Sequence, residues 1–377
     1  MSLGGRLLNA ADDALQVALD TTRLASSAFH ARWWPRRKSD LRGGACHCPP
    51  GAPLHLLHSE GLREGADIVV DYGANVGAPH RFQVPPRALA RIAPQVAAGD
   101  VIHVKSELLA EFAAHVLPGI GAPFVLVTGD SDYAPVAAHR ALLDHPRIAH
   151  WFAQNCDIAE RHPRLTRIPI GMDNPRYTKM EKRIGFLVEM ALGKTKPDAT
   201  LSLNDIGNQK RMQEVARGQR TAMGEKPPRI LCTFHMNQKL VPNFAEIPDR
   251  LEAYETLKDA PFCHFVTHRL PQEECWRIHA DFAFELSPRG KGLDCFRTWE
   301  SLFLGTVPIV RTTTLDPLYQ DEDLPVVIVQ DWREVTQANL RRWQEELRHR
   351  FTPALTRKLT TDYWLDKIRA AAMLAAR

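Results

Sequence analysis

Residues 284–310 read FELSPRGKGLDCFRTWESLFLGTVPIV, and this stretch decides the fold. A short apolar run ends in a loop that holds two glycines and two cations, and a helix-like segment follows directly. Gly305 stands where the C′ glycine of that helix belongs, and a β-branched apolar run comes next. The pattern predicts a buried strand, a glycine loop, a helix and a second strand, as in a parallel α/β sheet.

The loop between the predicted strand and helix has the chemistry of an anion-binding site. Backbone N–H groups at a helix N-terminus point at a ligand, and the helix dipole favours negative charge there. Gly290 and Gly292 would let phosphates approach the backbone. Arg289 and Lys291 would add charge-assisted hydrogen bonds to a diphosphate. Asp294 is the predicted N-cap of the helix.

Polar and aromatic residues of the predicted helix are placed on different faces. Arg297 and Glu300 are three positions apart and therefore share one face. A carboxylate one turn below a phosphate site is well placed to accept hydrogen bonds from ribose hydroxyls. Phe296, Trp299 and Phe303 are expected to pack the helix on the sheet. Taken singly, the pair Arg297 and Glu300 could be an ion pair on the solvated surface, and the glycine loop could be an ordinary turn. Their occurrence together in this order is more specific for a functional site.

This order of residues resembles the donor-binding signature of exostosin-like glycosyltransferases, and more loosely that of α-1,3-fucosyltransferases. The matching residues are SPRG at 287–290, Asp294, Arg297, WESL at 299–302 and GTVP at 305–308. The resemblance covers residues 281–310 and extends over 229–335, whereas the N-terminal half matches the family poorly and leaves the acceptor open. It implies the GT-B fold, in which two Rossmann-like domains face each other across a cleft.

The same resemblance implies roles for individual residues. Arg289 would contact the donor diphosphate, Glu300 would hold the nucleotide ribose, and Arg297 would support one of these contacts. The implied reaction moves a sugar from a nucleotide-diphosphate donor, with a UDP-sugar slightly favoured, to a hydroxyl of a growing glycan. Inversion and independence of a metal are also implied. The nucleotide sugar is then a substrate, and no cofactor is expected.

Strand-like and helix-like segments alternate in both halves of the chain, which predicts an α/β protein. Two such halves indicate two doubly wound, Rossmann-like parallel-sheet domains that face each other across a cleft, where the ligand belongs. The predicted divisions are an N-terminal appendage at residues 1–50, an acceptor domain at 51–175, a connector at 176–228, a nucleotide-sugar-binding domain at 229–335 and C-terminal helices at 336–377.

The elements are predicted from short apolar runs and longer helix-like stretches. Predicted strands lie at residues 67–71, 101–104, 124–128, 167–170, 229–234, 263–267, 282–286, 307–310 and 326–329. Predicted helices lie at residues 86–97, 107–116, 135–143, 182–192, 272–279, 295–304, 335–350 and 362–375. Residues 151–157 and 168–174 are expected to be strand ends that open into cleft loops.

Two aspartates directly follow the strand predicted at 124–128, in the run TGDSD. Carboxylates at the carboxyl end of a strand point toward the expected cleft. An inverting transfer needs a general base for the acceptor hydroxyl, so Asp130 and Asp132 are the candidates. Alternatively, Asp130 or Ser131 only caps the following helix. The spacing also resembles a metal-binding DxD pair, but GT-B enzymes typically neutralise the leaving diphosphate with cations and helix dipoles, so no metal is expected.

Further polar residues and a glycine follow other predicted strands. Asn155, Gly171 and Asn174 are expected to line the acceptor or donor side of the cleft, although turn chemistry explains them equally well. Asn237 and Lys239 follow the first strand of the second half, a position that suits contacts with the donor.

The composition limits the classes of function. The chain has 377 residues, enough for two domains of ordinary size. Its net charge of +4 and pI of about 8.7 suit an anionic ligand but lack the basic footprint of a nucleic-acid-binding protein. No apolar run approaches the roughly 18 residues that a membrane span needs. Seven cysteines lack the spacing of a disulfide framework, so we expect free thiols in a reducing, cytoplasmic compartment.

Residues 1–40 have a character of their own. Residues 7–28 show an amphipathic helical pattern, and residues 33–38, WWPRRK, add aromatic and basic side chains. Such a segment either makes a peripheral contact with an anionic membrane surface or packs on the body of the protein. Asp12 and Asp20 interrupt its apolar residues, which argues against a signal peptide.

Two other functions remain open. IVVDYGANVG at residues 68–77 resembles the first motif of S-adenosylmethionine-dependent methyltransferases, in which glycines accommodate the cofactor. Such an enzyme needs an acidic residue at the end of the next strand, where this chain has Lys105, and Pro79 would interrupt the first helix. The second alternative is a degenerate transferase that binds glycan or partner proteins without catalysis.

Overall fold

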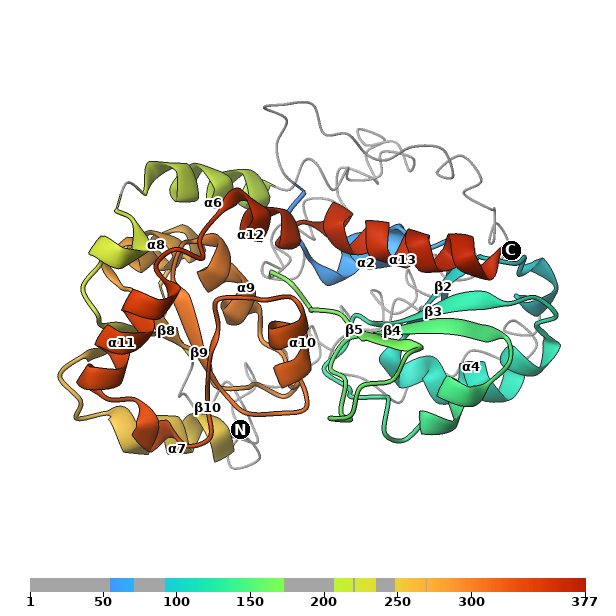
Figure 1. Ribbon diagram of the computed structural model, residues 1–377, viewed down its shortest axis with the longest axis horizontal. Coiled ribbons are helices and arrows are strands. Elements are labelled where there is room, and N and C mark those ends of the chain that lie inside the picture. The colour runs from blue at the N-terminus through green and yellow to red at the C-terminus, as the bar shows by residue number, and fades with distance from the viewer. Residues whose placement is uncertain (1–54, 71–91, 173–206, 220, 235–247, 269) are drawn as a thin grey trace, which may run out of the picture.

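The protein folds into two parallel β-sheets with helices packed on them (Figure 1). The computed structural model describes residues 55–70, 92–172, 207–219, 221–234, 248–268 and 270–377. The predicted α/β class, with two Rossmann-like parallel-sheet domains, is confirmed. The appendage predicted at residues 1–50, the helix predicted at 182–192 and the glycines of the methyltransferase-like motif lie outside the described residues.

Within the described residues, each sheet has five strands. The strands of the first sheet are β1 (Ile68–Val70), β2 (Val101–Lys105), β3 (Phe124–Gly129), β4 (Ile148–Ala153) and β5 (Leu165–Arg167). The strands of the second sheet are β6 (Ile230–Cys232), β7 (Cys263–Phe265), β8 (Phe284–Leu286), β9 (Val307–Arg311) and β10 (Val327–Val329).

Helices surround both sheets. The α-helices are α2 (Ser59–Glu64), α4 (Leu109–His115), α6 (Gly207–Gly218), α7 (Pro248–Leu257), α8 (Gln272–Ile278), α9 (Phe296–Phe303), α10 (Asp316–Asp321), α11 (Gln337–Leu347), α12 (Pro353–Lys358) and α13 (Thr361–Ala375). The 3₁₀ helices are η2 (Ala93–Gln95), η3 (Ser106–Leu108), η4 (Leu117–Gly119), η5 (Arg140–Asp144), η8 (Met223–Glu225), η10 (His279–Asp281) and η11 (Trp332–Glu334). Within the described ranges, none of the helices combines the length and the apolar character of a membrane span.

The predicted elements of the second half are present with small shifts at their ends, whereas the first half differs more. The strand predicted at 167–170 is β5, which already ends at Arg167. The helix predicted at 135–143 is replaced by the shorter η5. β4 was predicted only as a strand end, because His150 interrupts its apolar run; the ring of this residue is bonded to the Thr166 hydroxyl of β5 at 2.8 Å.

The second sheet has the strand order β10-β9-β8-β6-β7, and every neighbouring pair is parallel. β6 lies between β7 and β8, so the chain winds first to one side and then to the other. This is the expected doubly wound order, and its switch point lies between β6 and β8. Open α/β sheets bind ligands outside the carboxyl ends of the strands at such a point, which here is where the glycine loop follows β8.

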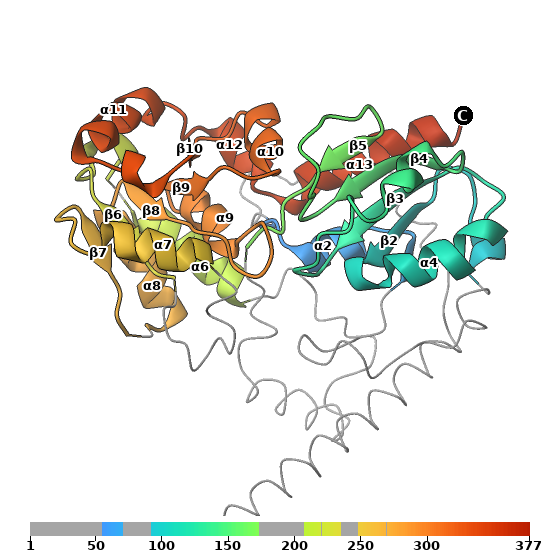
Figure 2. The ribbon, with the colours of Figure 1, turned by 90° about the horizontal axis from the view of Figure 1, so that it is seen from below.

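The first sheet is also parallel, but its strands follow one another in sequence order from β1 to β5. The expected doubly wound order is therefore wrong for the described part of this domain. Right-handed crossovers between sequential neighbours all lie on one face and leave the other face open. Helix α13, from the C-terminal end of the chain, closes that face by packing on β2, β3 and β4, on the side opposite to α4 (Figure 2).

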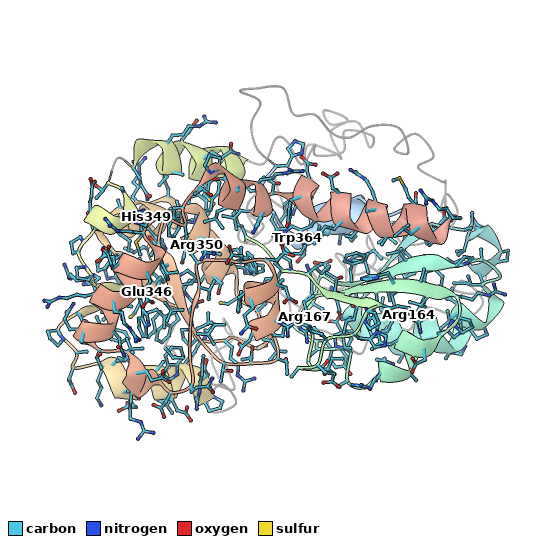
Figure 3. The ribbon with its side chains drawn as sticks, viewed as in Figure 1. Arg164, Arg167, Glu346, His349, Arg350 and Trp364 are labelled. Atoms are coloured by element: carbon cyan, nitrogen blue, oxygen red, sulfur yellow. The ribbon has the colours of Figure 1, made fainter. Side chains whose placement is uncertain are left out.

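The two domains are joined by an apolar cluster that spans the junction, and the second sheet has a further core of its own. Trp299 of α9 and Leu318 of α10 belong to the same buried cluster as the strands of the first sheet. Arg167 lies at the junction of the two domains (Figure 3). Its guanidinium adds a polar link, because it donates to the Thr314 carbonyl of the second domain at 3.0 Å, and it also donates to the Ile158 carbonyl of the first domain at 2.5 Å. The carboxyl ends of β4 and β5 therefore meet the carboxyl ends of β8 and β9.

Helix α9 ends in a Schellman motif, which confirms the prediction made from Gly305. The N–H of Thr306 donates to the carbonyl of Ser301 at 2.9 Å. The N–H of Gly305 donates to the carbonyl of Leu302 at 3.3 Å. Gly305 has a φ of +68°, a left-handed conformation that glycine adopts without steric penalty. The buried ammonium of Lys226 donates to the Gly305 carbonyl at 2.8 Å, so the helix end is satisfied away from water.

We expect Gly305→Ala to lower the free energy of unfolding by about 1–2 kcal/mol, because a Cβ is strained at this positive φ. Gly121→Ala is the matched control, since Gly121 has no positive φ and an added Cβ would meet no atom within 4 Å. Chemical denaturation of both variants measures the difference. Equal midpoints for the two variants would contradict a left-handed end of α9.

Candidate active site

The glycine loop of the second domain contacts two loops of the first domain directly. The backbone N–H of Asp294 donates to the side-chain oxygen of Asn155 at 2.8 Å. The side-chain amide of Asn155 donates in turn to the carbonyl of Ser131 at 2.8 Å. Asn155 is 1% exposed and has a φ of +48°, which asparagine tolerates better than most residues. The segments that follow β3, β4 and β8 are therefore assembled around one buried amide.

Asp294 holds the start of helix α9 against the first domain. Its buried carboxylate accepts the N–H of Ile170 at 2.9 Å, that of Cys295 at 2.7 Å and the indole N–H of Trp299 at 2.9 Å. The helix begins at Phe296 with Cys295 as its N-cap, so the prediction of Asp294 as N-cap is wrong. The carboxylate instead bonds across the domain junction to the N–H of Ile170. Burial raises the pKa of Asp294 to about 6, although the N–H donors act in the opposite direction.

A second carboxylate, that of Asp249 in helix α7, fixes the other end of the loop. It accepts the backbone N–H of Arg289 at 2.9 Å and the indole N–H of Trp332 at 3.1 Å. The backbone N–H groups of Arg289, Asp294 and Cys295 are thus all bonded to side chains of the protein. These three N–H groups therefore do not face a ligand, and an anion at this loop would depend on the cationic side chains and on the N–H groups of residues 290–293.

Arg250 of helix α7 joins the predicted cations at the loop. Its Nε donates to the carbonyl of Arg289 at 3.2 Å, and a Cβ added at Gly290 would lie 3.1 Å from its Nη2. Burial and the nearby Arg297 guanidinium lower the pKa of Arg250. Within the described part of the chain no carboxylate forms an ion pair with Arg250 or Arg289, and Lys291 is exposed. Three cations, Arg250, Arg289 and Lys291, therefore lie at the loop without a carboxylate in an ion pair with any of them within the described residues.

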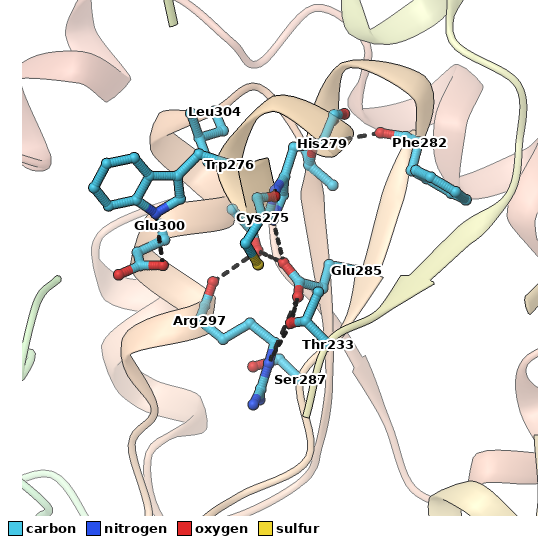
Figure 4. A network of polar contacts seen from close by, with 12 residues as sticks. Thr233, Cys275, Trp276, His279, Phe282, Glu285, Ser287, Arg297, Glu300 and Leu304 are labelled. Carbon is cyan, nitrogen blue, oxygen red and sulfur yellow. Dashed lines mark hydrogen bonds and ion pairs between the residues drawn. The ribbon is translucent and has the colours of Figure 1, made fainter. Parts of the chain in front are cut away.

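A buried network of charges lies at the switch point of the second sheet (Figure 4). Glu285 in β8 has no exposed surface, and its carboxylate lies 2.5 Å from His279 Nε2 and 3.5 Å from Arg297 Nε. The hydroxyls of Thr233 and Ser301 donate to the same carboxylate. Burial opposes the charged form of both partners, but their mutual attraction lowers the pKa of Glu285 and raises that of His279. The network thereby fixes Arg297 beside the loop.

Glu300, the predicted ribose contact, is held in place by helix α8. Its Oε2 accepts the indole N–H of Trp276 at 3.1 Å and the amide N–H of Gln272 at 3.4 Å. Trp299, which was expected to pack α9 on the sheet, is fully buried and lies in the apolar cluster that also holds the strands of the first sheet. The expected packing is wrong for Phe296, which is 40% exposed because it is the first residue of the helix and lies at the domain surface.

The two candidate bases of the first domain lie in different surroundings. Asp130 has a φ of +56°, and its carboxylate forms an ion pair with Arg63 at 2.8 Å. The Asp132 side chain reaches solvent, yet groups of both domains lie around it. Burial raises the pKa of Asp132, Lys291 opposes this shift, and the Glu107 carboxylate adds to it. Asp132 is thus within electrostatic reach of the glycine loop.

The other predicted site residues have varied positions. Gly171 has a φ of +76°, and a Cβ there would lie 2.4 Å from the Leu57 carbonyl oxygen, so close backbone packing requires glycine. Asn174, Asn237 and Lys239 lie outside the described residues. Among the side chains that the structure describes, no group of three or more His, Cys, Asp or Glu is arranged to hold a metal ion.

Sequence reasoning missed four residues of this site, namely Asp249, Arg250, His279 and Glu285. Glu285 had a visible signal, because a carboxylate inside an apolar strand needs a buried partner. The other three reach the site from α7 and η10, and no local pattern marks them.

Solved structures that are similar to this chain include glycosyltransferases. One is AviGT4, a glycosyltransferase involved in avilamycin A biosynthesis, with 13% identity, 84% of this chain and 87% of that chain covered, and a TM-score of 0.36. Another is the catalytic domain of starch synthase IV from Arabidopsis thaliana bound to ADP and acarbose, with 10% identity, 81% and 79% covered, and a TM-score of 0.32. A third is OtsA, with 12% identity, 86% and 87% covered, and a TM-score of 0.31. No family model matches the sequence, and no curated protein matches it significantly.

We expect the stability difference between the wild type and Asp294→Asn to depend on pH. The folded state raises the pKa of Asp294 from 3.8 to about 6, so the stability due to this group is complete below pH 3.8 and is lost as the pH rises through 6. Relative to the variant, the wild type should lose about 2.4 kcal/mol of unfolding free energy between pH 4 and pH 7, because the carboxyl of the unfolded chain is already more than half ionised at pH 4. Denaturant titrations at both pH values measure this, and a difference that stays constant or grows would contradict the shift.

Proposed function

We propose that this protein is a glycosyltransferase that moves a sugar from a nucleotide-diphosphate donor to a hydroxyl of a growing glycan. The observation that carries the proposal is a glycine loop with several cations at the switch point of the second domain, which Asn155 joins to the Ser131–Asp132 peptide of the first domain. Such a site suits a reaction in which a diphosphate leaves while an acceptor hydroxyl loses its proton.

The donor diphosphate is proposed to bind at residues 287–295. Arg250, Arg289 and Lys291 supply positive charge there, and the dipole of α9 adds to it. These groups would stabilise the charge that develops on a leaving diphosphate, so we propose a transfer that needs no metal and no cofactor. A UDP-sugar is the first donor to test.

The nucleotide ribose is proposed to bind at Glu300. Trp276 and Gln272 orient its carboxylate, which would accept hydrogen bonds from the ribose hydroxyls. Arg297, one turn earlier in the same helix, is held by Glu285 and would support the phosphate side of the nucleotide. The buried network beside the loop then has a function, because it keeps a guanidinium in place before the ligand arrives.

Asp132 is the proposed general base, in preference to Asp130. The Asp130 carboxylate is engaged by Arg63, whereas Asp132 lies near Lys291 of the donor loop. The Asp132 side chain is exposed, and partial desolvation and the Glu107 carboxylate raise its pKa, which makes it a better proton acceptor. Deprotonation of the acceptor hydroxyl and its direct attack on the anomeric carbon, opposite the leaving diphosphate, would invert the configuration of the sugar.

We expect UDP to raise the melting temperature in a panel with GDP, ADP, CMP and S-adenosylmethionine. Ligand at roughly 100 times its Kd adds about 2.7 kcal/mol of stability, which gives a shift of several degrees. Arg289→Ala and Lys291→Ala should each weaken UDP binding roughly 10- to 100-fold, because each removes a bond to a charged group. Arg342→Ala, an exposed cation in α11, is the control and should bind UDP normally. Stabilisation by S-adenosylmethionine alone would favour the methyltransferase alternative.

We expect Asp132→Asn to reduce UDP release from UDP-sugars about 10²- to 10⁴-fold, because a general base contributes a factor of this size. Affinity for UDP should stay close to that of the wild type, since the amide removes the base and keeps the shape. Asp144→Asn, which changes an exposed carboxylate of η5, is the control. The assignment fails if Asp132→Asn turns over normally, and a loss confined to Asp130→Asn would transfer the role to that residue.

A further inference from the structure

We propose that Asn155 is a positioning residue that sets the separation between the base loop, residues 129–133, and the donor loop, residues 287–295. The kinetic meaning of this inference rests on the proposed function, whereas the contacts that carry it do not. One side-chain amide is bonded to both loops, and each loop belongs to a different domain.

The first bond of Asn155 reaches the peptide group next to the candidate base. Its Nδ2 donates to the Ser131 carbonyl at 2.8 Å, and this carbonyl belongs to the peptide unit that links Ser131 to Asp132. The plane of that unit includes the Cα of Asp132, so a rotation of the peptide would move the carboxylate. Asn155 therefore restrains the backbone from which the base projects.

The second bond of Asn155 reaches the donor loop. Its Oδ1 accepts the N–H of Asp294 at 2.8 Å. Gly292 packs on the same amide, since a Cβ there would lie 3.0 Å from Oδ1 and 3.1 Å from Nδ2. Asp294 is itself locked to the first domain through the N–H of Ile170. The donor loop is thus fitted around the Asn155 side chain.

The chemistry of asparagine suits this position. The side chain offers a donor and an acceptor at a fixed separation, and the residue tolerates the φ of +48° found here. With only 1% of its surface exposed, the amide has no access to bulk water, so each of its bonds is costly to break. A displacement of about 1 Å in a reacting group costs on the order of 100-fold in rate, which gives a rigid spacer between the loops its kinetic value.

Amide hydrogen exchange of the protein without ligand tests whether Asn155 connects the two loops. It measures the exchange rate of the base loop, residues 129–133, in variants whose substitution lies outside that loop. Asn155→Gly keeps the left-handed backbone and removes both bonds, so exchange should rise in residues 129–133 and in residues 287–295. Gly292→Ala presses on Asn155 from the donor loop and should also raise exchange in the base loop. Gly290→Ala is the matched control in the same loop: its Cβ meets the end of Arg250 instead and should leave the base loop unchanged.

Kinetics test the positioning role with a double-mutant cycle. Asn155→Gly should lower kcat for sugar transfer about 100-fold and change the UDP affinity less than about 3-fold. In an Asp132→Asn background the same change should have little further effect, because Asn155 acts through the base. If Asn155 had a purely structural role, the fold losses in kcat of the two single variants would multiply in the double variant.

The outcomes separate the two proposals. Unchanged exchange of residues 129–133 in Asn155→Gly and Gly292→Ala, or multiplicative kinetic losses, overturns the positioning role while the transferase function stands. Increased exchange in both loops of a protein that binds no nucleotide and releases no UDP overturns the proposed function, and it supports the connection between the loops.

Discussion

Inside the junction of the two domains, the carboxylate of Asp294 is removed from water and depends on N–H donors that the protein supplies. A buried carboxylate without such donors would cost several kcal/mol. The second domain provides Cys295 and Trp299, but the donor of Ile170 comes only with the first domain. Docking of the domains therefore completes the solvation of this group. The apolar core that continues across the junction favours the same arrangement.

The anchoring of the glycine loop determines what kind of anion site it makes. Asp249, Asn155 and Asp294 consume backbone N–H groups that would otherwise point at a ligand. These bonds fix the two ends of the loop, so an anion would be bound by the guanidinium and ammonium groups around it and by the N–H groups of residues 290–293. Arg297 is kept charged and in place by Glu285, while Arg250 has no carboxylate partner within the described residues. A bound diphosphate would form ion pairs with the cationic side chains of Arg250, Arg289 and Lys291.

Local patterns predicted the second domain because its decisive signals lie close together in the sequence. The strand, the glycine loop, the helix and Gly305 each depend on neighbours a few residues away. The N-cap prediction at Asp294 failed for the opposite reason, since the partner that turns its carboxylate away, Ile170, is 124 residues distant. Arg250 was missed likewise, because it is brought to the loop only by the fold. Asp132 was found from its place after a strand, but its difference from Asp130 depends on Arg63, Glu107 and Lys291.

The strand order of the first sheet could not be predicted from the sequence. Alternating strands and helices give the same sequence pattern whether the strands follow one another in order across the sheet or the order reverses direction. A sequential strand order leaves one face of the sheet without crossovers, and this apolar face must be covered by another segment. Trp364 and Ile368 of α13 are buried there, and the strand-like residues beside α2 bond to the turn before α13, with Leu57 N–H donating to the Leu359 carbonyl at 2.9 Å. The first sheet is thus completed by the chain that has already passed through the second domain. Helix α13 and the shared apolar cluster hold the two domains together, and the bonds of Asn155 fix the spacing of the two loops within that frame.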